Sequence, residues 1–229
     1  MPLTNTPSGL LILVHDPLEP VADDAIYSAL ASMYEDVPTH IHRIEPNYSS
    51  LSCSSLSPDQ WASEIAAQDR FFDEVTRQHL EKHADCEVIY FGTAPIPLAM
   101  HLGYRLTAMR KVRIFLQDNR TGNWHPTNST AGAPQTNGIP AETFQGAGDV
   151  VLRFGTETRI NPEDTHAVVA QPVKEIEIQP EVLGRDIFGS HEQLQAYSQA
   201  FRSALDAVSS HLPRAHAVHL FAAIPVGLA

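Results

Sequence analysis

The sequence is poor in cysteine and lacks the short motifs that identify many enzymes. Its two cysteines, Cys53 and Cys86, form no CxxC pair, which argues against a zinc site or a disulfide framework. No GxSxG, Walker or GxGxxG sequence occurs, and the twelve histidines include no HExxH. We therefore expect no bound metal and no cofactor. Low cysteine content is typical of a reducing, cytoplasmic setting.

Long apolar runs and an excess of positive charge are also missing. Fifteen basic residues against 27 acidic ones give a formal charge of -12, which disfavours binding to long nucleic acids. The apolar run Leu10–Val14 is far shorter than the roughly 20 residues that span a bilayer, so we expect no membrane contact and no signal peptide. A small nucleotide remains compatible with this charge, because it needs only a few local donors.

What the chain does contain is a regular alternation of strand and helix patterns. Continuous aliphatic runs predict buried strands, and segments with helical spacing follow them. The order β-α-β-α-β-α-β predicts a doubly wound, parallel sheet. We expect strands at 10–14, 39–44, 86–91 and 111–117, and helices at 20–34, from 59 to about 80, and after the prolines near 96.

A stretch rich in Pro, Gly, Thr and Asn, residues 123–148, then interrupts the pattern and predicts a domain boundary. We place a first unit at 1–145 and a second at 146–229. The second unit restarts the plan, with strands expected at 148–154, 168–178 and 217–222 and a helix at 193–208. The expected fold class is α/β, with two Rossmann-like units, mainly parallel sheets and a truncated second unit.

One strand-turn-helix element occurs twice. Residues 90–99, YFGTAPIPLA, and 220–229, LFAAIPVGLA, share Phe, Pro, Leu and Ala at equivalent positions. In open parallel sheets, ligands bind beyond the carboxyl ends of strands, where small residues let a ligand approach the backbone. The alternative is that small residues and prolines only make a tight connection between strand and helix.

The segments YFGTAPIPLAMHLGYRL, VRIFLQDNRTGNW and HLFAAIPVGLA resemble the SAVED domain family, over 86–124 most clearly and 150–229 more loosely. These are sensors of bacterial antiviral signalling, with two fused units similar to the CARF domains of type III CRISPR systems. The resemblance implies that both units line a pocket for a cyclic tri- or tetranucleotide, commonly a cyclic oligoadenylate. Family domains continue with a further helix and strand, whereas this chain stops at Ala229.

The resemblance also implies an output and a mode of action. Ligand binding in the family, which includes CBASS systems, drives head-to-tail assembly of identical chains. Assembly switches on a fused or partner effector, such as a nuclease, protease, TIR or membrane protein. Family members usually bind the ligand without cleaving it, so we expect a binding module and not an enzyme.

The expected ligand-binding residues lie at the two bends and at neighbouring strand ends. Small and proline residues would admit the ligand, and polar side chains would contact its bases and phosphates. These residues are Gly92, Thr93, Ala94, Pro95, Ile96 and Pro97 in the first bend, Ala223, Ile224 and Pro225 in the second, and His15, Asp16, Gln117, Arg120, Trp124, Arg153 and Thr156 at strand ends.

Each polar candidate has a structural alternative. Gln117 either reads an adenine edge or lies at a solvated strand end, and Trp124 either stacks on a base or packs in the core. Arg153 interrupts an apolar run and needs a partner, for which a ligand phosphate is one choice. His15 either contacts the ligand or caps the next helix.

Two rival functions remain open. Some CARF relatives are ring nucleases, phosphodiesterases that open cyclic oligoadenylates, a reaction that needs a positioned ribose 2'-hydroxyl and a cation for the phosphate. A scaffold that binds only proteins predicts no nucleotide affinity. His40 and His42 share one face of a strand, but no Asp or Glu accompanies them at metal-ligand spacing.

Overall fold

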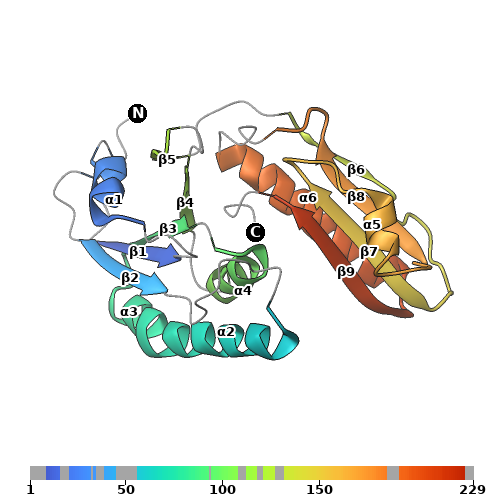
Figure 1. The fold of residues 1–229 in the computed structure, drawn as a ribbon, viewed down its shortest axis with the longest axis horizontal. Helices are drawn as coiled ribbons and strands as arrows, with labels where there is room; N and C mark the ends of the chain where they lie inside the picture. Colours follow the sequence, from blue (N-terminus) through green and yellow to red (C-terminus); the bar gives the residue numbers. More distant parts are fainter. Residues whose placement is uncertain are drawn as a thin grey trace. The chain divides into compact units, whose positions relative to one another are not determined.

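The chain forms two α/β units, spanning Met1–Pro126 and Thr127–Leu228 (Figure 1). The division falls earlier than position 145, because a strand at 134–137 pairs within the second unit's sheet. The computed structural model describes residues 9–15, 21–31, 33–34, 39–44, 56–92, 94–107, 112–117, 121–126, 132–184 and 191–224.

The first unit is built on a five-stranded sheet in the order β2-β1-β3-β4-β5. Its first four members are parallel, as the sequence pattern predicts, whereas β5 runs antiparallel to β4 at the edge. All six residues of β1 are buried, because helices cover both faces of the sheet. The strands are β1 (Leu10–His15), β2 (Thr39–Ile44), β3 (Glu87–Gly92), β4 (Val112–Gln117) and β5 (Trp124–Pro126).

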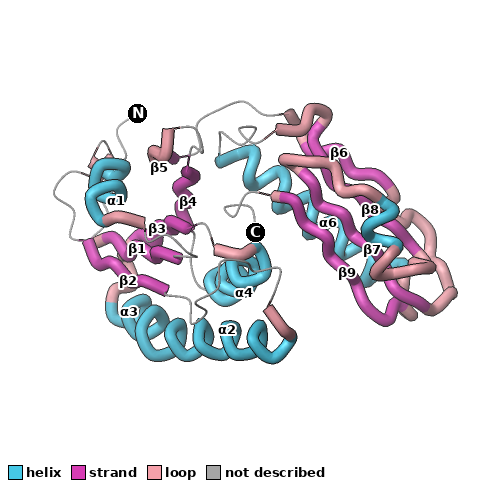
Figure 2. Tube along the Cα trace, in the orientation of Figure 1, coloured by secondary structure: helices cyan, strands magenta, loops and turns pink. Residues whose placement is uncertain are grey.

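Helices lie on the two faces of this sheet (Figure 2). Helix α1 (Asp23–Leu30) covers the face that Leu10, Ile12 and Val14 present, together with Phe91 and Trp124. The opposite face is covered by α2 (Pro58–Phe71), the π-helical turn η2 (Phe72–Thr76), α3 (Arg77–Lys82) and α4 (Ile96–Thr107).

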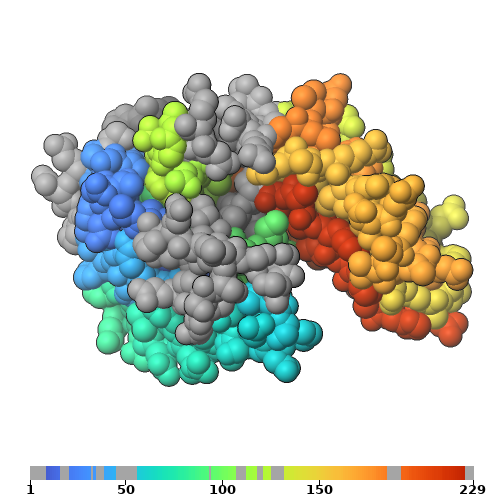
Figure 3. All heavy atoms as spheres, in the orientation of Figure 1, coloured from blue at the N-terminus to red at the C-terminus, as the bar shows by residue number. Residues whose placement is uncertain are grey.

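The α2–α3 segment is one long helix with a π-turn inside it. Its buried residues are four apart, at Glu64, Gln68, Phe72, Thr76 and Leu80. A spacing of four drifts by about 40° per step around an α-helix of 3.6 residues per turn. The wider π-turn takes up part of this drift and keeps the five residues on the sheet side. The other residues of the segment are half-buried or exposed, and part of its outer face is visible in Figure 3.

The second unit has a four-stranded sheet in the order β6-β8-β7-β9. Strand β7 is parallel to both neighbours, and β6 is antiparallel to β8. The strand expected at 168–178 begins only at Lys174, because a short helix and turns precede it. The elements are β6 (Pro134–Asn137), β7 (Gly148–Gly155), α5 (Pro162–His166), β8 (Lys174–Pro180), α6 (His191–His211) and β9 (Ala215–Ala223).

Both sheets repeat one order of strands. In each, the first parallel strand is central, the second lies on one side of it and the third on the other: β2-β1-β3 and β8-β7-β9. The two copies of the repeated sequence begin in the equivalent strands β3 and β9. The topology therefore supports an internal duplication. No helix among the described residues is long and apolar enough to cross a bilayer.

Candidate functional site

Each sheet has a point where the strand order reverses, between β1 and β3 in the first unit and between β7 and β9 in the second. Open α/β sheets bind ligands at such a switch point, outside the carboxyl ends of the strands. The last residues of β1 and β3, His15 and Gly92, are direct register partners. Gly155 and Ala223 form the corresponding pair of β7 and β9. These two edges are the candidate sites.

The first bend runs from Gly92 into α4 and presents small and proline side chains. Ala94 is buried, Pro95 and Ile96 are half-buried, and Pro97 is exposed. The amides of Leu98 and Ala99 donate to the Pro95 carbonyl at 3.0 and 3.1 Å. Proline has no amide hydrogen, so Ile96 is the only residue among Pro95–Pro97 whose backbone amide can donate. The bend therefore suits an apolar ring better than a phosphate.

Gly92 is required at its position by close packing. A Cβ atom there would lie 2.6 Å from the Tyr90 hydroxyl oxygen and 2.9 Å from the His15 Cβ. Real Cβ atoms do not make contacts this short, so a larger residue would displace its neighbours. Glycine at position 92 thus allows the end of β3 to pack closely against the end of β1.

His15 and Tyr90 form a buried pair beneath the bend. His15 is 3% exposed, and its Nδ1 lies 3.3 Å from the Tyr90 hydroxyl oxygen. Burial lowers the pKa of His15 to about 4 and raises that of Tyr90, so both are uncharged at neutral pH. The sequence left open whether His15 contacts the ligand or caps the next helix. In the structure its buried side chain instead packs against Tyr90 beneath the first bend.

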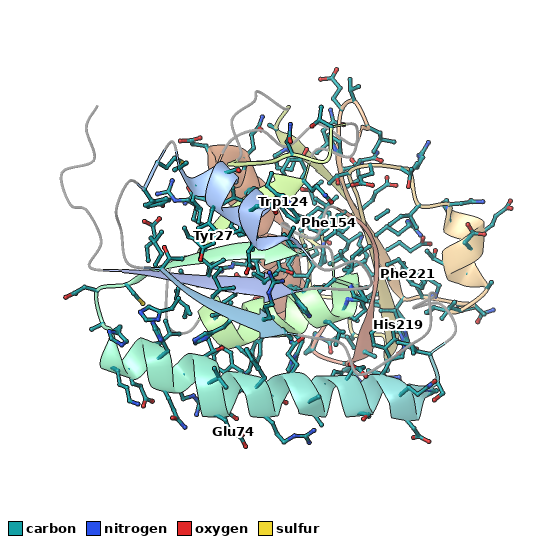
Figure 4. The ribbon with its side chains drawn as sticks, turned by 60° about the vertical axis from the view of Figure 1, so that its left-hand side comes forward. Tyr27, Glu74, Trp124, Phe154, His219 and Phe221 are labelled. Carbon is teal, nitrogen blue, oxygen red and sulfur yellow. The ribbon has the colours of Figure 1, made fainter. Side chains whose placement is uncertain are left out.

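Gln117 and Trp124 are register partners at the end of β4, yet their environments differ. The Gln117 side chain is exposed, and its Nε2 donates to the Gly122 carbonyl at 3.3 Å. Trp124 is only 8% exposed and packs edge-on against Phe91, with ring centroids 5.3 Å apart. It lies among the side chains of the first unit (Figure 4). The structure therefore gives Trp124 the core-packing role and leaves Gln117 accessible.

At the second edge, backbone hydrogen bonds join the ends of β7 and β9. The amides of Thr156 and Glu157 donate to the Ala223 carbonyl at 2.9 and 3.2 Å. Thr156 is fully buried, and Ile224 is 6% exposed. This edge is closely packed. Its two strands, β7 and β9, end side by side as β1 and β3 do in the first unit.

Arg153 finds its partners within the second unit. Its Nη2 lies 2.6 Å from Glu175 Oε2, and its Nη1 donates to Thr165 Oγ1 at 2.9 Å. Burial acts to raise the pKa of Glu175, but hydrogen bonds and positive charge from Arg153 and His166 lower it overall. The partner that the sequence required for Arg153 is a carboxylate of the protein, so a ligand phosphate is not needed for that purpose.

Arg113 pairs with Glu87 at 2.7 Å near the amino ends of β3 and β4, the opposite edge of the sheet from the first bend. Thr93, Asp16, Arg120 and Pro225 lie outside the described residues.

Sequence reasoning missed the side chains that hold α4 in place. Arg105 of α4 pairs with Asp69 and Asp73 on the adjoining helix, and its guanidinium lies 4.9 Å from the centre of the Phe72 ring. Gln68 donates to the Leu98 carbonyl at 3.0 Å, in the first turn of α4. The only signal in the sequence was the four-residue spacing of Asp69 and Asp73, which does not identify their partner.

The family model for SAVED, the "SMODS-associated and fused to various effectors sensor domain", matches residues 69–229. No curated protein matches the chain. Among solved structures, the chain is similar to the Acinetobacter baumannii Cap4 SAVED/CARF-domain containing receptor with the cyclic trinucleotide 3'3'3'-cAAA. The TM-score is 0.59 at 16% identity, covering 94% of this chain and 44% of that one.

The same receptor with 2'3'3'-cAAA gives a TM-score of 0.58, again at 16% identity, with 94% of this chain and 44% of that chain covered. A further structure of this receptor gives a TM-score of 0.55 at 16% identity, with 93% of this chain and 42% of that chain covered. The chain thus spans less than half the length of the solved chains it matches. At this identity the likeness establishes the shared fold.

Proposed function

Because this chain belongs to the SAVED family of sensor domains, we propose that it binds a cyclic oligonucleotide of the cyclic tri- or tetra-adenylate type. Binding then activates an effector, fused or in a partner protein, in cytoplasmic antiviral defence of the CBASS or type III CRISPR kind. The family is described as a sensor domain fused to various effectors, which supports separate sensing and effector parts. The chain itself acts as a binding module.

The observation that carries the proposal is the bend at the switch point of the first sheet. His15 and Gly92 end adjacent parallel strands there, and the chain turns through Ala94 and Pro95 into α4. Half-buried Pro95 and exposed Pro97 offer apolar faces on which a base or ribose packs. The exposed amide of Gln117, two strands from His15 in the same sheet, is suited to reading an adenine edge.

Recognition by packing and hydrogen bonds agrees with the charge of the chain. A formal charge of -12 gives no general attraction for a ligand that carries one phosphate per nucleotide. Affinity must then come from local contacts, such as the Ile96 amide and the proline faces. The end of β9, at the half-buried Ala223, is the equivalent edge in the second unit.

We further propose that the ligand acts through head-to-tail assembly of identical chains. A ligand shifts an equilibrium only by its difference in affinity for the two states. It must therefore bind the assembled form more tightly than the free chain. Sedimentation with and without cyclic tri-adenylate measures this directly, and the expected result is larger particles only when the ligand is present.

The binding proposal is tested by thermal shift with cyclic di-, tri- and tetra-adenylate and with linear tri-adenylate. Ligand at 100 times its dissociation constant stabilises a protein by about 2.7 kcal/mol. We expect stabilisation by the cyclic tri- or tetranucleotide that is strongly reduced in Pro95→Glu, because a carboxylate there repels the phosphates. Gln117→Ala should weaken binding less, since it removes hydrogen bonds without adding repulsion.

Pro213→Glu, at an exposed turn after α6, is the matched control and should bind as the wild type does. Equal affinity in wild type, Pro95→Glu and Gln117→Ala would reject the site. Incubation with cyclic tri- and tetra-adenylate followed by chromatography separates sensing from cleavage. Intact ligand supports the binding module, and accumulation of linear product would establish the rival ring-nuclease activity instead.

A further inference from the structure

Four histidine rings meet where the edge strand β2 adjoins the end of α3. His40 and His42 come from the strand, and His79 and His83 come from the helix and its C-cap. Ring centroids are separated by 4.5 Å for His79 and His83 and by 4.9 Å for His40 and His79. The separations are 5.1 Å for His42 and His79 and 5.9 Å for His40 and His83. His79 therefore contacts all three of the others.

The local backbone explains why these rings share one surface. Residues two apart on a strand point to the same side, as do residues four apart on a helix. His40 and His83 are exposed, and His42 and His79 are half-buried. The histidine cluster, as we call these four residues, is thus open to solvent on one side and set on two regular elements.

The histidine cluster contains a buried ring nitrogen that makes no hydrogen bond. Within the described residues, this nitrogen is the Nδ1 of His42. An imidazole nitrogen coordinates a metal ion through its lone pair, which such a nitrogen can offer.

We propose that the histidine cluster binds one divalent transition-metal ion of the zinc, nickel or copper class. Imidazole nitrogen suits these ions, whereas magnesium and calcium prefer oxygen. Tetrahedral ligands about 2 Å from a zinc ion place the centres of two imidazole rings about 5 Å apart. The four centroid separations given above, from 4.5 to 5.9 Å, lie on either side of that value.

The four rings would have to change orientation for the cluster to bind a metal ion. Among the described residues, no three His, Cys, Asp or Glu side chains are already arranged to hold a metal ion. The rings of His40 and His83 are stacked, with their planes 26° apart, and the rings of His79 and His83 are tilted by 34°. His40 and His83 are exposed, so their side chains have room to rotate, and metal binding would require their nitrogens to turn toward one point shared with His79. The bound ion would join β2 to α3.

The test is isothermal titration of untagged protein with zinc chloride at pH 7.5, repeated with nickel and magnesium chloride. We expect one zinc ion per chain and no heat of binding with magnesium. His79→Gln should weaken zinc binding by roughly tenfold or more, because it removes the central ligand. His216→Gln, an exposed histidine on β9, is the matched control and should leave zinc binding unchanged.

Cobalt provides a spectroscopic readout that does not depend on heats. Visible absorption bands of tetrahedral, nitrogen-ligated cobalt should appear with wild-type protein and His216→Gln and be weaker with His79→Gln at the same cobalt concentration. A thermal melt without metal establishes that His79→Gln is folded. Cyclic tri-adenylate binding by His79→Gln should equal that of wild type, so this inference and the proposed function fail separately. Zinc binding that is absent from wild type, or equal in His79→Gln, would overturn the metal site.

Discussion

At the scale of single residues, Gly92 is the most constrained position in the first bend. The Tyr90 hydroxyl and the His15 Cβ occupy the space that a side chain would need. We expect Gly92→Ala to lower the free energy of unfolding by about 1–3 kcal/mol, the usual cost of overpacking. Urea unfolding measures this change.

Gly132→Ala is the control for that substitution, because nothing lies within 4 Å of a Cβ at Gly132. Its effect should stay within about 0.5 kcal/mol. Equal stability of Gly92→Ala and Gly132→Ala would show that the bend can relax, and that Gly92 is not needed to pack β3 against β1.

His15 makes a prediction about pH. Its pKa is about 4 in the folded protein and 6.5 in the unfolded chain, so the unfolded chain binds the proton more tightly. The stability from uncharged His15 is complete above pH 6.5 and is lost as pH falls toward 4. The full difference corresponds to about 3 kcal/mol, of which about 2 kcal/mol is lost by pH 5.

Urea unfolding at pH 7.5 and pH 5 measures this dependence. Wild type should be less stable at pH 5, and His15→Gln should show a smaller difference between the two pH values, because glutamine does not titrate. The exposed His216→Gln should keep the wild-type difference. A His15→Gln variant with the full wild-type difference would contradict a buried, uncharged His15.

At the scale of elements, Arg105 fixes the helix that follows the bend. Its side chain, 21% exposed, pairs with Asp69 of α2 and Asp73 of η2. Loss of a partly buried, charge-assisted hydrogen bond costs about 1.5–3 kcal/mol. Arg105→Gln should therefore lower the melting temperature, and it should weaken cyclic oligonucleotide binding because α4 carries Ile96 and Pro97.

Arg77→Gln is a close control for Arg105→Gln. Arg77 also pairs with Asp73 and also lies over the Phe72 ring, but its side chain is 44% exposed and its partner is on the same helical segment. Exposed pairs of this kind contribute about 0.3–0.5 kcal/mol. Similar losses in the two variants would mean that Arg105 does not anchor α4.

Helices and strands were predicted correctly where their signal is local in the sequence, and they were missed where they depend on contacts with distant residues. The strand at Thr39–Ile44 was predicted with its observed bounds, because alternation and flanking turns are local signals. Strands β5 and β6 were missed, since they lie in a stretch rich in Pro, Gly, Thr and Asn and owe their conformation to pairing with β4 and β8. The π-turn also depends on packing, which periodicity does not record.

The candidate site was likewise predictable only where its signal is local in the sequence. The place of the first bend at the carboxyl edge of its sheet was predicted, because small residues and prolines after a strand are a sequence signal. The second bend continues past Ile224, outside the described residues, so its place stays a prediction. The partners of His15, Arg153 and Trp124 could not be predicted, since each contact joins residues far apart in the chain. Of the histidine cluster, the sequence pattern identified only His40 and His42, which share one face of a strand.

At the scale of the whole molecule, the central claim is that a duplicated strand-bend-helix element binds a cyclic nucleotide. Both copies begin in the third strand of a sheet with the order second, first, third. Residues 69–229, which the SAVED family model matches, include both copies. Both copies of the repeated element therefore lie within the part of the chain that the family model matches.

Photo-crosslinking with an azido-adenine derivative of cyclic tri-adenylate, followed by tryptic digestion and mass spectrometry, locates the bound ligand directly. Cleavage after Lys82, Arg105 and Arg214 places the two bends in peptides 83–105 and 215–229. We predict that label enters these two peptides and is displaced by unmodified ligand. Displaceable label confined to other peptides would contradict the binding role of the duplicated element.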